Sequence, residues 1–212
     1  MRVLELFKGG GSISKYFECM PNVEVISLDI LEKYNPTICC DIMEWDYKQY
    51  PKDYFTIIWA SCECKVFSTL QYCLLGRKGG CKTREELTQK QKENSKYFLK
   101  TFEIINYFNC KYWFVENPMY SHIWDYIPEN LEYNEVNVSY CKFGFDYQKN
   151  TRIITNKKVL ECCLCRKVNG VYACCGLPKH KSNMGKLGSQ KQGLIERYSI
   201  PQKLLQYLFC EF

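Results

Sequence analysis

The chain has 212 residues, 46% hydrophobic, 16% aromatic and 25% charged, which excludes intrinsically disordered and low-complexity classes. No stretch approaches the roughly 18 consecutive apolar residues of a transmembrane helix, so we expect no membrane contact. The opening residues, MRVLELFKGGGS, are typical of a strand and a glycine-rich turn, not of a secretory signal. We therefore expect the fifteen cysteines to be reduced thiols, metal ligands or nucleophiles in a cytoplasmic or nuclear protein. The length fits one monomeric domain with a small appendage.

The net charge of +6 is unevenly distributed along the chain. Residues 142–212 hold 13 lysines and arginines against 4 acidic residues, whereas residues 1–141 hold 16 against 19. A basic end on a nearly neutral body favours a polyanionic partner such as nucleic acid. A solvated basic tail with no partner is an equally good interpretation of charge alone.

The predicted elements alternate between short apolar strands and helices. The expected strands are residues 2–7, 23–28, 37–40, 54–60, 112–115, 136–140 and 152–155. A helix is expected after the glycine-rich turn, to about residue 17, and a long helix is expected over 84–109. This order predicts an α/β fold with a mostly parallel sheet and a final antiparallel pair of strands. Ligands bind such sheets beyond the carboxyl ends of the strands.

Ligand-type residues follow the first three predicted strands. The turn FKGGGS lets the backbone approach a ligand closely and presents the free N–H groups of a helix start. Asp29, at the end of the second strand, can accept both hydroxyls of a ribose. Asp41 and Ile42, after the third strand, can contact the edge and the face of an adenine. Solvated turn residues or helix caps are the competing interpretation of either aspartate.

A second group of chemically active residues lies at 161–180. Two residues separate Cys162 from Cys165, and Cys174, Cys175 and His180 follow, a spacing typical of a tetrahedral zinc knuckle. We predict zinc bound by Cys162, Cys165, Cys175 and His180, although the paired cysteines leave the choice of sulfur open. A reduced, cysteine-rich loop without metal is the alternative. Cys62, Cys64, Cys73 and Cys81 offer a weaker second metal cluster because their spacing is irregular.

Several ordered motifs together resemble the cytosine carbon-5 methyltransferases, particularly their small phage and large-virus branch. The motifs are ELFKGGGS at 5–12, SLDI at 27–30, DI at 41–42, SCECKVFS at 61–68, VENP at 115–118, YCKFGFDYQKNTRIITN at 140–156 and ERYSIPQKLLQYLF at 196–209. The resemblance implies a Rossmann-like S-adenosylmethionine-dependent methyltransferase encoded by a virus. Its cofactor pocket would be lined by Phe7, Gly9, Gly11, Ser12, Asp29, Ile30, Asp41 and Ile42. It implies a catalytic core at 1–156, a small basic Cys/His-rich insertion at 157–192 as a reduced target-recognition region, and a closing segment at 193–212.

The resemblance also implies the catalytic groups. Cys64 corresponds to the nucleophile that adds to carbon 6 of cytosine, and Glu116 to the acid that holds the ring nitrogen. Arg152 corresponds to the second arginine of the family's Gln-x-Arg-x-Arg motif. We expect Cys64 and Glu116 to face one cavity, with Arg152 on its wall and Glu63 turned outward.

The implied substrate is cytosine in DNA, methylated at carbon 5 after it is flipped out of the duplex. The same reaction on RNA and a catalytically inactive nucleic-acid-binding relative are the alternatives. Two departures from the family pattern bear on activity. Cys62 and Glu63 replace its Pro-Pro pair, and Asn150 stands where its first arginine is expected.

Overall fold

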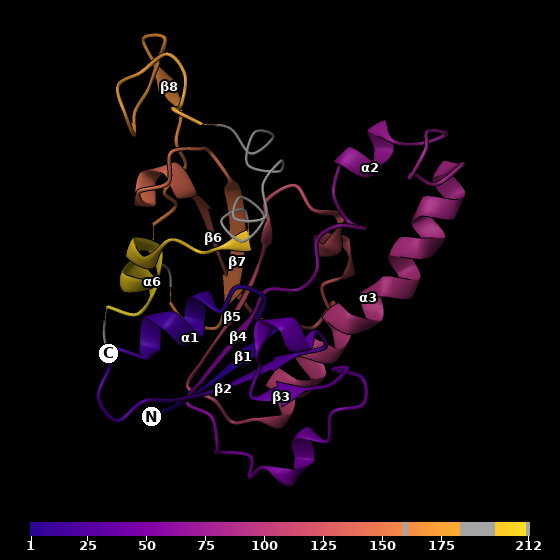
Figure 1. Ribbon diagram of the computed structural model, residues 1–212, viewed down its shortest axis with the longest axis vertical. Coiled ribbons are helices and arrows are strands. Elements are labelled where there is room, and N and C mark those ends of the chain that lie inside the picture. The colour runs from indigo at the N-terminus through magenta and orange to yellow at the C-terminus, as the bar shows by residue number, and fades with distance from the viewer. Residues whose placement is uncertain (159–160, 183–197, 211–212) are drawn as a thin grey trace.

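The computed structural model describes residues 1–158, 161–182 and 198–210 (Figure 1). In this part of the chain, no helix is both long and apolar enough to cross a membrane. The predicted insertion at 157–192 is therefore described in part, and residues 193–197 of the closing segment lie outside the described residues.

Within the described residues, seven strands form the main sheet and four α-helices accompany it. The strands are β1 (Arg2–Leu6), β2 (Glu24–Asp29), β3 (Ile38–Cys39), β4 (Ile57–Ala60), β5 (Tyr112–Pro118), β6 (Asn134–Ser139) and β7 (Asn150–Thr155). The α-helices are α1 (Ser12–Phe17), α2 (Leu70–Cys73), α3 (Arg84–Tyr107) and α6 (Gln202–Leu208). The 3-10 turns are η1 (Glu32–Tyr34), η2 (Tyr47–Gln49), η3 (His122–Tyr126) and η4 (Tyr140–Phe143). A separate hairpin pairs β8 (Lys167–Val168) with β9 (Val171–Tyr172).

The strand order confirms the predicted α/β class and places a ligand crevice. The order is β3-β2-β1-β4-β5-β7-β6, with β3, β2, β1, β4 and β5 mutually parallel. β7 runs antiparallel to both β5 and β6, so the predicted antiparallel pair is confirmed. The chain order reverses between β1 and β4, and a crevice opens beyond the carboxyl ends of parallel strands at such a switch point.

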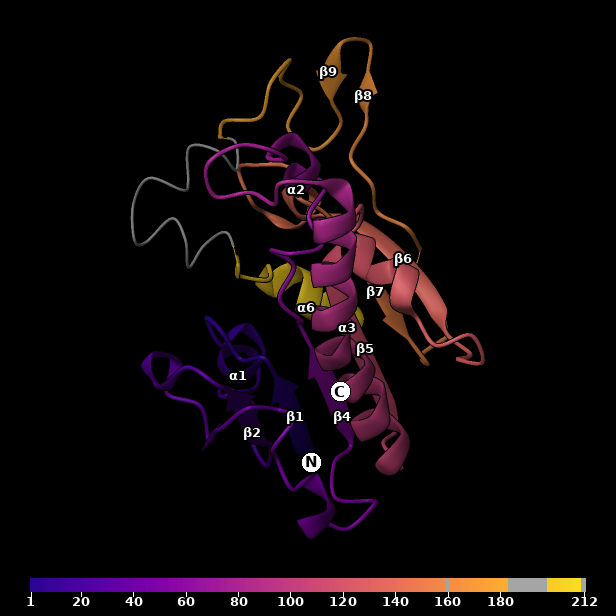
Figure 2. The same cartoon turned by 90° about the vertical axis from the view of Figure 1, so that its right-hand side faces the viewer.

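Two hydrophobic clusters cover the opposite faces of the sheet, because successive strand residues point to opposite sides. On one face, Leu4, Ile58 and Val115 pack under Phe98 and Phe102 of α3. On the other face, the remaining strand residues pack against helices from both ends of the chain. That second cluster includes Val3, Trp59, Phe114, Ile13, Phe17, Leu204, Leu205 and Leu208. Figure 2 shows α3 lying along the sheet, with α6 on the far side.

The long helix begins where its sequence supplies a cap. The Thr83 hydroxyl accepts a hydrogen bond from the Glu86 N–H at 3.2 Å, and Glu85 and Glu86 place negative charge in the first turn. Both features stabilise a helix N-terminus. The helix ends at Tyr107, two residues before the predicted end.

β5 is longer than predicted, and this moves two site residues into the sheet. The predicted strand ended at residue 115, whereas β5 continues to Pro118. The extension exists because β7 pairs with it, with Glu116 opposite Ile153 and Asn117 opposite Arg152. Glu116 therefore lies in a strand, paired with β7 on one side, and not in a turn.

Candidate active site

A cavity of about 670 Å³ opens beyond the carboxyl ends of β1, β2, β4 and β5. Its lining contains seven of the eight residues predicted to bind the cofactor: Phe7, Gly9, Ser12, Asp29, Ile30, Asp41 and Ile42. Cys64 and Glu116 line the same cavity. The structure thus brings together residues that the sequence separates by more than a hundred positions.

Asp29 fixes the glycine-rich turn. Its Oδ2 accepts a hydrogen bond from the Gly9 N–H at 2.9 Å, and its Oδ1 accepts one from the Leu31 N–H at 2.9 Å. The carboxylate is 8% exposed, and each of its oxygens keeps a further lone pair for a ligand. Phe7, Gly9 and Gly11 have φ values of 58°, 49° and 68°, so the turn uses the left-handed region at three positions.

Asp41 and two isoleucines form the next part of the wall. The Asp41 Oδ1 accepts a hydrogen bond from the Met43 N–H at 2.9 Å. Ile42 is buried, whereas Ile30 is 61% exposed at the rim. An apolar side chain exposed at a cavity rim is available to a flat ring.

Gly11 is the one predicted cofactor residue outside the lining. It is the N-cap of α1 with a φ of 68°, and a Cβ there would lie 3.2 Å from the Lys8 side chain. Its role in the structure is to start the helix.

Glu5 is a site residue that the sequence reasoning missed. Gly11 has no side chain to cap α1, and the Glu5 carboxylate accepts the N–H bonds of Ile13 and Ser14 instead, each at 3.1 Å. Burial raises the pKa of Glu5, and these hydrogen bonds oppose the rise. The available signal was an acidic residue at an interior position of an otherwise apolar strand.

Three hydrogen bonds from neighbouring elements hold the loop that carries Cys64. The Asn117 side chain donates to the Cys62 carbonyl at 2.8 Å, and the Gln91 side chain of α3 donates to the Val66 carbonyl at 3.1 Å. The His122 N–H donates to the Phe67 carbonyl at 2.8 Å. The loop is thereby fixed without the proline pair that the family uses.

The charge around Cys64 is mixed. Burial raises the pKa of its thiol, the Lys149 ammonium opposes that rise, and the carboxylates of Glu116 and Glu63 add to it. Glu63 is exposed but lines the same cavity, so the expectation that it turns outward is not met, and its contribution is the smallest of these. The neighbouring Cys62 is fully buried, and burial raises its pKa to about 12. Cys64 is therefore the more readily ionised thiol of the two.

Glu116 is buried between two polar side chains. The Tyr140 hydroxyl donates to its Oε1 at 3.0 Å, and the Lys149 Nζ lies 3.6 Å from the same oxygen. Burial and the Glu116 charge together raise the pKa of Tyr140, so this phenol remains a hydrogen-bond donor. Lys149 also lies 4.7 Å from the centre of the Tyr140 ring and lines the cavity.

Arg152 lies outside the cavity, so its predicted position on the wall is wrong. Its Nε lies 3.4 Å from the Glu135 Oε2, and its guanidinium stacks 5.4 Å from the centre of the Trp124 ring. Arg152 pairs with Asn117, the strand neighbour of Glu116, so its side chain leaves the sheet on the face opposite to that of Glu116. Asn117 on that face does line the cavity, so the contacts with Glu135 and Trp124, and not the register alone, keep the guanidinium away from the wall. Lys149, which the sequence reasoning did not select, is the cation at this wall.

Only one group of potential metal ligands occurs among the described residues, and it differs from the predicted set. It consists of Cys141, Cys165, Cys174 and His180, whose ligand atoms all lie within 4.8 Å of one another. The predicted Cys162 and Cys175 are outside it. Both are exposed, and the Cys162 sulfur accepts a hydrogen bond from the Asn137 N–H. Cys62, Cys64, Cys73 and Cys81 do not form a ligand group.

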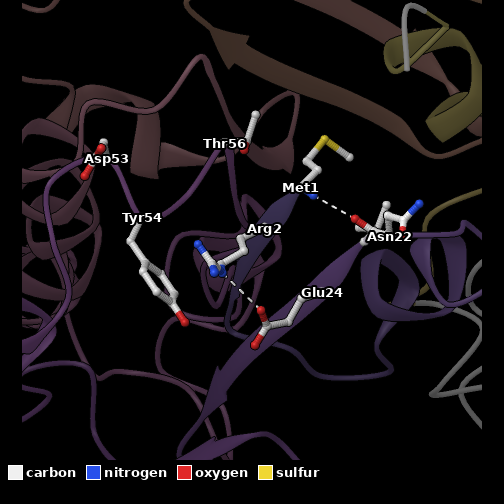
Figure 3. Close-up of a pocket in the computed structure, with 8 residues that line it drawn as sticks. Met1, Arg2, Asn22, Glu24, Asp53, Tyr54 and Thr56 are labelled. Atoms are coloured by element: carbon white, nitrogen blue, oxygen red, sulfur yellow. Dashed lines mark hydrogen bonds and ion pairs between the residues drawn. The ribbon is translucent and has the colours of Figure 1, made fainter.

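A second hollow, of about 460 Å³, lies at the opposite edge of the sheet (Figure 3). There Arg2 pairs with Glu24 at 3.1 Å and stacks on the Tyr54 ring at 4.3 Å, while the Met1 amino group donates to the Asn22 carbonyl. These contacts close the amino ends of the strands and include no thiol.

Comparison with known proteins identifies the family of the chain. No family model matches it. It is similar to the "probable DNA (cytosine-5)-methyltransferase" of Frog virus 3 (isolate Goorha), with 33% identity over 161 residues, 74% of this chain and 71% of that protein. The chain belongs to the DNA (cytosine-5)-methyltransferase family.

Solved structures of low sequence identity share the fold of this family member. The Entamoeba histolytica methyltransferase EhMeth matches with a TM-score of 0.60 and 12% identity, over 100% of this chain and 98% of that one. The S. pombe Dnmt2 methyltransferase matches with a TM-score of 0.50 and 17% identity, over 76% and 52%. The predicted Rossmann-like methyltransferase fold is confirmed.

The structure shows what replaces the family's first arginine, from which this sequence departs at Asn150. Asn150 replaces the family's first arginine, and its side chain is engaged by Ser139 at 2.6 Å and by Gln148 at 3.1 Å. The adjacent Lys149 supplies a buried cation beside Glu116. A positive charge is thus retained near the predicted acid, one residue earlier in the chain.

Proposed function

We propose that this protein transfers a methyl group from S-adenosylmethionine to carbon 5 of a cytosine in DNA. The observation that supports this function is that Cys64 and Glu116 line the same cavity as Gly9, Asp29 and Asp41. A methyl donor and a target base bound in one cavity can react directly.

The residues of the cofactor side suit S-adenosylmethionine. When bound, this cofactor supplies an electrophilic methyl group on a positively charged sulfur. The free lone pairs of Asp29 would accept hydrogen bonds from the ribose hydroxyls. Ile30 and Ile42 would contact the faces of the adenine, and Asp41 would accept from its amino group.

On the target side, Cys64 would act as the nucleophile. Its thiolate adds to carbon 6 of the cytosine, and the electron pair moves through the ring to carbon 5, which attacks the methyl carbon. Glu116 would donate a proton to the ring nitrogen and accept a hydrogen bond from the exocyclic amine, so that the ring can take up the electron pair. In that attack the bond between the methyl carbon and the cofactor sulfur would break, and the sulfur would keep the electron pair as a neutral thioether. Loss of the carbon-5 proton to water would then re-form the double bond between carbons 5 and 6, break the bond between carbon 6 and the Cys64 sulfur and restore the thiolate, while the ring nitrogen returns its proton to Glu116.

Lys149 would favour the ionised form of Cys64 and orient Glu116. Its ammonium lies next to the Glu116 carboxylate and lowers the pKa of the Cys64 thiol. The role assigned to Arg152 stays a prediction. In the structure its guanidinium is engaged by Glu135 and Trp124.

DNA is the proposed polymer because the similar Frog virus 3 protein is described as a DNA methyltransferase and because the C-terminal third is basic. A cytosine inside a duplex has to be flipped out to reach Cys64. On the ground of that viral relative we also propose a virus-encoded enzyme.

The test is transfer of tritium-labelled methyl groups from the cofactor to DNA and to RNA. Wild-type protein is expected to label DNA at carbon 5 of cytosine, and Cys64→Ser to label nothing while still binding the cofactor. Cys73→Ser, at an exposed cysteine that ends α2 shortly after this loop, is the matched control and should retain activity. Labelling of RNA alone would replace the proposed substrate.

Covalent capture by 5-fluorocytosine DNA separates an active enzyme from a silent relative. In the presence of the cofactor, the thiolate adds to the fluorinated ring and carbon 5 takes the methyl group; carbon 5 then carries fluorine and no proton that can be lost, so the protein stays attached. Wild type should be captured and Cys64→Ser should not. Equal capture of both would move the nucleophile to another residue.

A further inference from the structure

Four potential metal ligands converge at the junction between the catalytic core and the segment at 161–182. Three are sulfurs and one is an imidazole nitrogen, and all lie within 4.8 Å of one another. The Cys174 sulfur lies 3.2 Å from the His180 Nε2. Ligands about 2.3 Å (sulfur) and about 2.0 Å (nitrogen) from one tetrahedral zinc ion are separated by similar distances.

The backbone delivers two of the ligands from the edge of the main sheet. Cys141 lies in η4, directly after β6. Cys163 pairs with β6 through two backbone hydrogen bonds. Its N–H donates to the Asn137 carbonyl at 2.9 Å, and its carbonyl accepts from the Ser139 N–H at 3.0 Å. This pairing places Cys165, which is 5% exposed, beside Cys141.

The β8–β9 hairpin delivers the other two. Asn169 and Gly170 have φ values of 51° and 82°, and two positive φ values in succession are typical of the tight type I′ turn of a two-residue hairpin. The returning strand leads to Cys174, and a further turn brings the His180 ring to 3.9 Å from the Tyr172 ring. The tight turn at Asn169 and Gly170 therefore reverses the chain, so that Cys174 and His180 lie close to Cys165.

The chemical environment of the cluster calls for a cation. Cys141 and Cys165 are buried, and the ligand atoms of Cys141, Cys165, Cys174 and His180 all lie within 4.8 Å of one another. Three sulfurs this close repel one another as thiolates unless a positive ion lies between them. Three thiolates and one neutral imidazole form a donor set that selects zinc.

We propose that Cys141, Cys165, Cys174 and His180 bind one structural zinc ion, which fastens the basic hairpin segment to the catalytic core. The four positions are filled by protein, so the site is closed and no water or substrate enters it. The ion is structural and takes no part in methyl transfer.

A short network of hydrogen bonds connects the proposed zinc site to the active site. The Gln148 side chain donates to the Cys165 carbonyl at 3.1 Å, and the Cys165 N–H donates to the Ser139 hydroxyl at 2.9 Å. Ser139 in turn holds Asn150 at 2.6 Å, on the other side of Lys149. Both views place the β8–β9 hairpin at the same end of the molecule as α2, which follows the carboxyl end of β4 (Figures 1 and 2). Loss of the ion would therefore release the hairpin from the beginning of β7, which Lys149 directly precedes.

The first experiment measures metal in the full-length wild-type chain, purified under reducing conditions without added chelator. Elemental analysis should find one zinc per chain. Replacement by cobalt should give the ligand-field bands of a tetrahedral ion and the charge-transfer band of three thiolates. These two measurements need no variant, so they remain decisive even where a ligand substitution prevents folding. Absence of zinc together with no cobalt spectrum would overturn the proposal, as would a mass showing a disulfide among these cysteines.

Substitutions then identify the ligands. Cys141→Ser and Cys174→Ser should lose the metal, whereas Cys162→Ser and Cys175→Ser should keep one zinc per chain. The second pair is a matched control, since both residues lie in the same segment and are exposed. His180→Cys should still bind, with the charge-transfer band of cobalt strengthened by a fourth thiolate. Loss of zinc from Cys175→Ser with retention in Cys174→Ser would refute this ligand set.

Discussion

At the residue scale, the environment of Cys64 balances one cation against two carboxylates. Burial already disfavours the thiolate, and the Glu116 and Glu63 charges disfavour it further, so Lys149 is the group that opposes all three. Cys62, two positions earlier, has no such cation and is buried against Thr101. The difference between the two thiols arises from where the loop places them, because both have the same chemistry.

Lys149→Met should therefore shift the pH dependence of the reaction. Removal of the ammonium raises the pKa of Cys64, so the increase of kcat/KM with pH moves to higher pH. Each pKa unit lowers the thiolate fraction at neutral pH about tenfold. The pH profile of methyl transfer and the alkylation rate of Cys64 both measure this shift. Lys149→Arg should restore most of the profile, and Glu63→Gln should move it slightly the opposite way. An unchanged profile in Lys149→Met would show that the lysine does not act on the thiol.

Asp29→Ala should weaken binding of S-adenosylmethionine. The carboxylate would lose one or two charge-assisted hydrogen bonds to the cofactor, each worth about 1.5–3 kcal/mol, so Kd should rise at least about tenfold. The glycine turn also loses its bond to Gly9. Calorimetry measures the affinity, with Asp53→Asn as control because Asp53 is exposed at the opposite edge of the sheet. Equal affinities would remove Asp29 from the cofactor site.

At the element scale, the C-terminal helix α6 completes one face of the core. Leu204, Leu205 and Leu208 are fully buried against Phe17 of α1 and the sheet. The Ile200 N–H donates to the Ser12 hydroxyl at 3.0 Å, across 188 positions of sequence. The residue that follows the glycine-rich turn is therefore hydrogen-bonded to the segment that leads into α6.

Leu205→Ala should destabilise the whole domain. Removal of a fully buried leucine costs about 2–5 kcal/mol through lost burial and the cavity that remains. Urea unfolding should show a lower midpoint with an unchanged slope. Gln206→Ala, exposed on the same helix, is expected to leave the midpoint nearly unchanged. A small effect of Leu205→Ala would mean that α6 docks independently of the core.

At the scale of the whole molecule, charge and shape are divided between two regions. The sheet with its helices holds the cavity, and the basic segment at 161–182 projects at the end of the molecule that also carries α2 (Figure 1). Arg166 and Lys179 are exposed on that segment. This division predicts that DNA affinity and cofactor affinity respond to different substitutions.

The double variant Arg166→Gln and Lys179→Gln should weaken DNA binding without changing cofactor affinity. If both cations contact phosphates, the slope of log affinity against log salt should fall by about 2. Fluorescence anisotropy with labelled DNA over a salt series measures this slope. Lys48→Gln with Lys52→Gln, exposed beside the amino ends of the strands, should leave it unchanged. An equal loss in both double variants would indicate attraction by net charge alone.

The sequence by itself determined the α/β class, the strands that precede the site, and the residues at their carboxyl ends. These are local properties, because apolar periodicity and glycine-rich turns act over a few residues. Asp29 and Asp41 could be selected in this way, Cys64 and Glu116 were selected through the resemblance to the methyltransferase family, and the cavity contains all four.

Only the tertiary structure decided the contacts between distant segments. The pairing of β7 with β5 buried Glu116 inside a strand, turned Arg152 to the other face and left Lys149 at the wall. Folding of residues 161–180 against β6 brought in Cys141 as a ligand and left Cys162 and Cys175 outside. The spacing of residues along the sequence could not reveal either outcome. The register of strand pairing decides which side chains of a strand face a site. A metal-ligand set is formed by the residues that the fold brings within a few ångströms of one another.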